Sequence, residues 1–217
     1  MKIKLPVLTV ILALIFLAAG CSQPPEEGTL DYVLENVRNN SIDTFTGVME
    51  ISSEMDGKTM ETITYIWYAG GRSRTESVDE EQHKQITIFD GTDSWIISDY
   101  DLSYVTVIRE PSGFDMFDFT NFGEPYELSY RGTETVEGRR AHGVEGVLEK
   151  DGFKEEVTWW VDAETWLPFI SENRTDLYTG KLIFRDIRIN KEVDESLLEY
   201  TPPEDVYVHE IFPEDRQ

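Results

Sequence analysis

Residues 85–98 read QITIFDGTDSWIIS, and this stretch decides the fold class. Apolar residues, mostly isoleucine, phenylalanine and tryptophan, dominate the runs on both sides of Asp90-Gly91, as they do in β-strands. An Asp-Gly pair between two such runs favours a tight β-hairpin. The stretch therefore predicts two antiparallel strands, 86–89 and 94–98, joined by a turn over 90–93.

Strand patterns continue in both directions along the chain, some of them with a clear period of two. In 155–162, Val157, Trp159 and Val161 share one face of a strand, while Thr158 and Trp160 share the other. About ten strands in sequence order with short turns predict a mainly β (α+β) domain built on a large antiparallel sheet. The remaining strands are expected over 63–67, 72–78, 104–108, 126–130, 138–149, 168–173 and 181–189.

Two segments break the strand pattern. Thr29 is a good helix cap, and apolar residues fall on one face over 29–39, so an amphipathic helix is expected there. Residues 111–125 are apolar without a clear period, so we expect them to cross the sheet as a buried loop or short helix. A last helical turn is expected over 196–200. The apolar residues of 111–125 are Phe114, Met116, Phe117, Phe119 and Phe122.

The first twenty residues are typical of a secretory signal. Lys2 and Lys4 precede an uncharged apolar run, and small residues lead to Cys21. The run is short of the roughly 20 apolar residues of a comfortable membrane span. The sequence LAAGC over 17–21 resembles a prokaryotic lipobox, although Ala18 stands where Leu is usual.

This resemblance implies that Cys21 is lipidated and anchors an extracytoplasmic protein at the cell surface or in the periplasm. Two acyl chains anchor stably where one does not. A plain secretory signal with a chance cysteine, or an uncut anchor, are the alternatives. We expect 1–20 to be a signal peptide, 21–28 the lipidated Cys21 and a tether, and 29–217 one folded domain.

The mature chain is strongly acidic. Cleavage before Cys21 removes Lys2 and Lys4 and leaves 17 basic and 43 acidic side chains, a formal charge of −26. Such a surface repels nucleic acid and anionic lipid, so neither is expected as a partner. The abundant aromatic and aliphatic residues argue against disorder.

Sequence motifs for catalysis, metals or cofactors are missing. His83, His142 and His209 lack metal-ligand spacing, and the aspartate pairs lack the glycine and distal glutamate of a calcium loop. There is no nucleophile elbow, phosphate loop or dinucleotide fingerprint. We therefore expect a protein that is not an enzyme and that needs neither a metal nor a cofactor.

The aromatic residues admit two interpretations. They fill an ordinary core, or they line a cavity for an apolar ligand, because one curved sheet with little helix has few partners to cover its apolar face. The cavity candidates are Trp67, Trp95, Trp159, Trp160, Phe114, Met116, Phe117 and Phe119.

The order of features along 29–208 resembles the LolA/LolB-like superfamily of outer-membrane lipoprotein-sorting and carrier proteins. The resemblance rests on the helix at 29–39, the Asp-Gly-to-Trp hairpin at 86–95, and a terminal Pro-Pro-x-x-Val at 202–206. It also uses Phe45-Thr46-Gly47, Trp67-Tyr68, Arg72-Ser73-Arg74, Trp160-Val161-Asp162, Leu167-Pro168 and the closing strand 184–190.

The resemblance implies a strongly curved, unclosed β half-barrel whose helix-covered mouth opens on an apolar cavity for acyl chains. It also implies that Arg72 or Arg74 helps to hold the lid. A lipid anchor on Cys21 departs from the soluble carriers of the family. The prediction is a lipid-anchored protein that binds an acyl chain or lipoprotein lipid. The alternative is an envelope sensor or scaffold that binds a protein or peptide.

Overall fold

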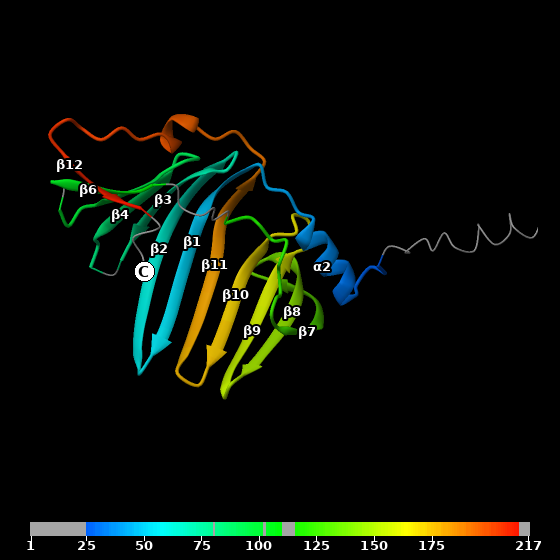
Figure 1. Cartoon of the computed structure of the whole chain (residues 1–217). Helices are drawn as coiled ribbons and strands as arrows, with labels where there is room; N and C mark the ends of the chain where they lie inside the picture. Colours follow the sequence, from blue (N-terminus) through cyan, green and yellow to red (C-terminus); the bar gives the residue numbers. More distant parts are fainter. Residues whose placement is uncertain (1–24, 80, 102, 110–115, 213–217) are drawn as a thin grey trace, which may run out of the picture.

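A computed structural model describes residues 25–79, 81–101, 103–109 and 116–212 (Figure 1). Within these residues the chain forms one helix, one short 3-10 helix and twelve strands. The helix is α2 (Leu30–Arg38) and the 3-10 helix is η1 (Glu195–Leu198). The strands are β1 (Thr44–Met55), β2 (Lys58–Ala69), β3 (Arg72–Val78), β4 (Lys84–Phe89), β5 (Ser94–Ser98), β6 (Tyr104–Ile108), β7 (Glu127–Val136), β8 (Arg139–Lys150), β9 (Phe153–Asp162), β10 (Pro168–Thr175), β11 (Tyr178–Ile189) and β12 (Tyr207–Ile211).

All twelve strands belong to a single sheet that does not close on itself. Its order is β12-β6-β5-β4-β3-β2-β1-β11-β10-β9-β8-β7, so it consists of two antiparallel meanders, β1–β6 and β7–β11, joined through the β1–β11 pair. The predicted mainly β fold with one large unclosed antiparallel sheet is confirmed. One detail differs, because β12 pairs with β6 in the parallel sense.

Two strands escaped prediction from the sequence. Along β1 apolar and polar residues do not alternate cleanly, and most side chains on both faces are partly exposed. The last strand, β12, has five residues and no buried side chain. Both strands form because a neighbouring strand offers its backbone groups, which a local pattern does not reveal.

The predicted helix is confirmed as α2. Thr29 caps it by accepting a hydrogen bond from the Tyr32 amide at 3.3 Å. Val33 and Val37 are fully buried against Val144 of β8 and Val161 of β9. We call the sheet face beneath α2 the helix face and the opposite face the hollow face.

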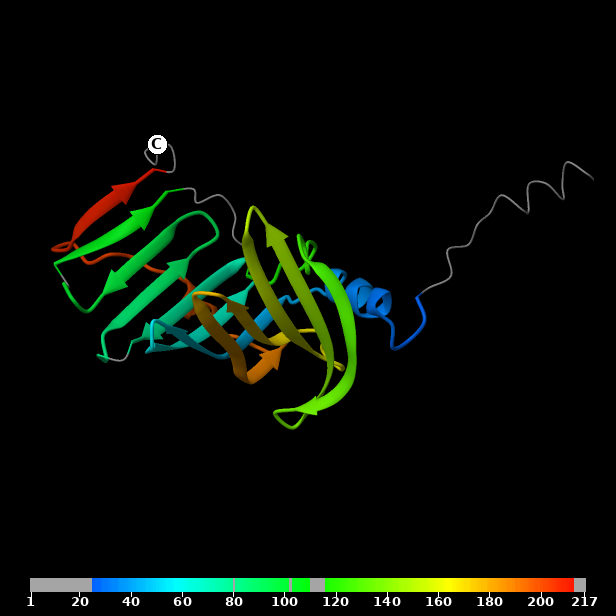
Figure 2. The ribbon, with the colours of Figure 1, turned by 90° about the horizontal axis from the view of Figure 1, so that it is seen from below.

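The half of the sheet from β11 to β7 curls toward the hollow face (Figure 2). Arg185 of β11 points to that face and forms ion pairs with Glu50 of β1 at 2.7 Å and with Glu137 at 3.2 Å. Glu137 lies in the turn between β7 and β8, three strands away. In a flat sheet with about 4.8 Å between strands that separation is at least ~14 Å. The ion pair therefore requires strong curvature, as the half-barrel prediction implied.

Three apolar clusters hold the sheet together. The first surrounds Phe45 and Phe169, the second joins α2 to β8 and β9, and the third lies under the C-terminal segment on the hollow face of β4–β6. That segment contains η1 and contributes Tyr200 and Val206 to the third cluster. Each half of the sheet is thus covered on a different face.

Candidate functional site

The tryptophans predicted to line one cavity are divided among separate clusters. Trp159 and Trp160 are adjacent and point to opposite faces, as the period of two predicted. Trp159 packs with Phe122 and Tyr126 near α2, at ring distances of 5.2 and 5.3 Å. Trp160 is buried on the hollow face, with the Arg131 guanidinium 5.3 Å from its ring.

Two glycines of β8 make these positions available. A Cβ at Gly146 would lie 2.9 Å from the Trp159 ring, and one at Gly143 would lie 3.0 Å from the Trp160 ring. Only a glycine lets each indole lie this close to the neighbouring strand.

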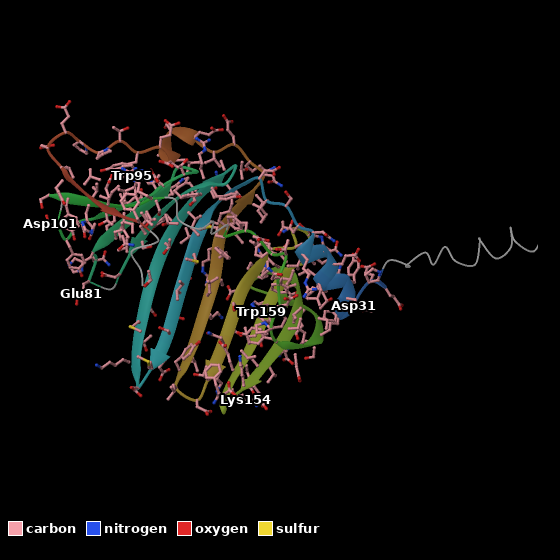
Figure 3. All side chains as sticks on the ribbon, in the orientation of Figure 1. Asp31, Glu81, Trp95, Asp101, Lys154 and Trp159 are labelled. Carbon is pink, nitrogen blue, oxygen red and sulfur yellow. The ribbon has the colours of Figure 1, made fainter. Side chains whose placement is uncertain are left out.

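The other two tryptophans belong to the β1–β6 half. Trp95 is buried in the third cluster, where its indole nitrogen donates to Asp90 at 3.1 Å and its ring contacts Tyr200. Figure 3 shows that Trp95 and Trp159 lie in opposite halves of the sheet. Trp67 is partly exposed on the hollow face and stacks with Tyr65, with 6.5 Å between the ring centroids.

The described residues from 116 onward in the connection between β6 and β7 pack against the helix face. Phe117 is 5% exposed, and its ring lies 4.7 Å from Phe45 and 5.0 Å from Tyr68. Met116 and Phe119 pack partly buried against the same cluster. The expected cover over the sheet is thus present for residues 116–125, whereas Phe114 and Cys21 lie outside the described residues.

The two arginines proposed to hold a lid differ in their partners. Arg72 pairs with Glu195 at 2.5 Å and with Glu199 at 3.8 Å, so it ties the start of β3 to the C-terminal segment around η1. Arg74 pairs with Glu76 on its own strand at 2.6 Å. Of the two, Arg72 contacts a covering segment, and a lid-holding role for either residue stays a prediction.

A hollow of about 460 Å³ opens on the hollow face, at the ends of β1, β11, β10 and β9 that lie away from α2. Hydroxyl, carboxylate and basic side chains dominate its walls, and Lys181 pairs with Glu172 at 2.9 Å. The face is apolar one row further along each strand, where Ile183, Ile170 and Trp160 are buried. The hollow-face side chains around the opening are Ser52, Glu54, Thr59, Glu156, Thr158, Glu172, Arg174, Thr179 and Lys181.

The helix face of β1 and β2 carries exposed apolar side chains. Ile51, Met55 and Met60 are 36%, 49% and 54% exposed. Together with Met49 and Leu182 they form what we call the methionine strip, since the strand register places all five on the helix face of β1, β2 and β11. Met49 packs against the Phe45–Phe117 cluster, so the strip continues the core outward.

Tyr126 and His142 are two of the titratable groups near the helix face whose pKa values are shifted. Burial, with a hydrogen bond from its hydroxyl to Glu155 at 2.9 Å, raises the pKa of Tyr126 to about 12. Burial lowers the pKa of His142, which stacks on Trp166 and shares its Nδ1 with the hydroxyls of Tyr130 and Thr133. Both groups stay neutral near pH 7, and both support packing.

Within the described residues, histidine, cysteine and acidic side chains do not gather in threes that could hold a metal ion. No helix within the described residues is long and apolar enough to cross a membrane. The side chains brought together at the hollow and at the methionine strip fit binding, and the absence of catalysis stays a prediction.

No family model and no curated protein matches the chain. A solved structure of the Pseudomonas aeruginosa MucA/MucB complex matches with 16% identity and a TM-score of 0.44, over 78% of this chain and 58% of that one. Lipoprotein LppX of Mycobacterium tuberculosis matches with 9% identity and a TM-score of 0.43, over 75% and 97% of the two chains.

A putative outer membrane lipoprotein-sorting protein domain from Vibrio parahaemolyticus matches with 12% identity and a TM-score of 0.37, over 77% of this chain and 94% of that one. These identities and TM-scores are too low to carry an argument about family or function. Function has to be argued from the chain itself, because a fold shared this remotely does not define a site.

Reasoning from sequence missed both surfaces. The hollow consists of single hydroxyl and charged residues from five strands, and an acidic chain offers no signal that would select them. The methionine strip had a usable signal: apart from Met1, the methionines are Met49, Met55, Met60 and Met116, and all four lie in the strip or the cover.

Proposed function

We propose that the protein is a lipid-anchored, extracytoplasmic binding protein that takes up an acyl chain or lipoprotein lipid on its curved sheet. The observation that carries this proposal is the methionine strip. Exposed apolar surface that continues a core is where soluble domains bind apolar partners. Methionine side chains are flexible and polarizable, so they adapt to a chain of variable shape.

The position of the strip suits an acyl chain. It begins at Met49, beside the Phe45–Phe184 ring contact of 5.6 Å, and runs to Met55 at the end of β1. The six residue steps of strand from Met49 to Met55 span about 20 Å, which is long enough for an extended fatty acyl chain. The lipid on Cys21 would hold the domain near the membrane that supplies such ligands.

Titration with a fluorescent fatty acid tests the proposal. Burial of a methionine or isoleucine side chain is worth about 1.5–3 kcal/mol, and the ligand would cover the exposed third of Ile51 and the exposed half of Met60. If each substitution removes about 1 kcal/mol of binding free energy, the Ile51→Ser/Met60→Ser double variant should bind the fatty acid roughly 30-fold more weakly.

Ile63→Ser is the matched control. Ile63 is 44% exposed, lies on the same strand as Met60 and points to the opposite face. Binding should be unchanged in this variant. Equal weakening in the control and in the double variant would refute a site on the methionine strip.

A protein or peptide partner is the second candidate, because the strip is open at the surface and Phe117 is packed into the core. Two results together would favour this candidate. The wild-type chain fails to bind the fatty acid, and a photo-crosslinker at position 60, but not at position 63, captures another envelope protein in cells.

A further inference from the structure

The hollow face carries a second arrangement, which the binding of an apolar ligand does not use. Its polar part is the hollow itself, where side-chain hydroxyls, carboxylates and basic groups converge. Ser52, Lys181, Glu172 and Thr158 form one row across β1, β11, β10 and β9, because the strand register pairs them in that order. The row presents hydrogen-bond donors and acceptors side by side over four strands.

An exposed aromatic surface lies on the same face, at the β2 side of the hollow. Tyr65 is 44% exposed and stacks with the partly exposed Trp67, with 26° between the ring planes. The two ring planes are therefore close to parallel, and an exposed ring face remains on the outer side of the pair. Tyr65 lies opposite Val48, which is four residues from Ser52 along β1, or about 13 Å.

Planar charged groups connect the rings to the hollow. Glu50 lies on β1 between Val48 and Ser52 and pairs with Arg185 at 2.7 Å. Glu50 is the diagonal neighbour of Tyr65, and Arg185 is directly opposite Val48 on the far side of β1. The side chains of Glu50 and Arg185 are 40% and 42% exposed, so a ligand can reach both, although Arg185 also pairs with Glu137 at 3.2 Å.

We propose that this surface is a binding site for a neutral oligosaccharide. A sugar ring has one face of C–H groups, which packs on the electron-rich face of an aromatic ring, and a rim of hydroxyls that both donate and accept. Carboxylates and guanidinium groups make the strong charge-assisted hydrogen bonds that such hydroxyls offer. Tyr65 and Trp67 supply the rings, and Glu50, Arg185, Glu172 and Lys181 supply the polar partners.

The charge and length of the surface narrow the ligand class. Around the opening of the hollow, Glu54, Glu156 and Glu172 face Arg174 and Lys181, so the lining has a slight negative balance within a chain of strong negative charge. This disfavours acidic glycans. The separation of about 13 Å between the Tyr65 row and the Ser52 row exceeds a single sugar ring, so a chain of several units is expected.

The test is calorimetric titration of the mature full-length protein in detergent micelles with neutral oligosaccharides of two to six units, in the α-glucan, β-glucan and chitin series. At least one series should bind more tightly as units are added. Tyr65→Ala and Glu172→Gln should each weaken that binding at least tenfold. Tyr207→Ala should not, because Tyr207 is a 68% exposed ring on β12, at the far edge of the sheet.

Two results would overturn the proposal. One is the absence of binding by every series at 10 mM saccharide, with the far-ultraviolet circular dichroism of the protein unchanged. The other is an equal loss of binding in the Tyr65→Ala and Tyr207→Ala variants. Fatty-acid binding is measured on the same samples. Because the methionine strip lies on the other face, failure of saccharide binding and failure of the proposed function can be told apart.

Discussion

Replacing Phe117 by alanine tests whether the connection between β6 and β7 holds the helix face closed. The ring is 5% exposed and contacts Phe45, Tyr68 and Phe119. A buried aromatic side chain removes about 200 Å² from water, worth ~5 kcal/mol as an upper bound. Phenylalanine-to-alanine changes in cores cost about 3–5 kcal/mol.

Urea unfolding followed by tryptophan fluorescence measures this loss, and thermal unfolding gives a second reading. At roughly 2–4 °C per kcal/mol for a domain of this size, Phe117→Ala should lower Tm by about 6–20 °C. Leu177→Ala is the control, because Leu177 is 75% exposed in a turn and its loss should stay within ~0.5 kcal/mol. A loss below about 1 kcal/mol in Phe117→Ala would show that the cover does not stabilise the sheet.

Three further predictions concern packing and charge. Burial is the main cause that lowers the pKa of His142, with Arg140 adding to it, so the unfolded chain binds the proton first. The free energy of unfolding should therefore fall as pH drops below ~6.5, by at most ~1.4 kcal/mol per pH unit, until the folded protein also binds a proton at His142. Urea unfolding of His142→Gln should show a shallower dependence of this free energy on pH. Gly146→Val should cost about 1–3 kcal/mol in the same assay, because its Cβ would lie 2.9 Å from Trp159 and 3.0 Å from Tyr126; full stability would contradict the packing described for Trp159. Arg109 pairs with Asp93 at 2.6 Å and with Glu210 of β12, so Arg109→Met should speed amide hydrogen exchange at 207–211 and leave β9 unchanged; equal exchange in both strands would refute this link.

Local signals in the sequence predicted most of the fold. The hairpin over 85–98 formed as expected, because Asp90 accepts hydrogen bonds from the Thr92 and Asp93 amides and shapes the turn that Gly91 permits. The helix followed from its Thr29 cap and one apolar face. The pairing of β1 with β11 could not be predicted, because it joins residues about 130 positions apart and depends on which strand edges remain free.

The candidate site was harder to predict than the fold. The two-residue period of a strand predicts that Trp159 and Trp160 point to opposite faces of the sheet. It does not predict which face a helix or a connecting segment will cover. The structure places Phe117 in the core and leaves Met60 exposed, although both are apolar. The difference arises because Phe117 packs against Phe45 and Tyr68, whereas Met60 lies at the other end of β2, beyond this cluster.

Native mass spectrometry of the chain without residues 1–21, purified from its host cells and then extracted with organic solvent, tests the central claim most directly. The account predicts a co-purifying acyl lipid at close to one per protein, and its loss in the Ile51→Ser/Met60→Ser variant. A clean apo mass that persists when lipids are offered to the folded wild-type chain would contradict it.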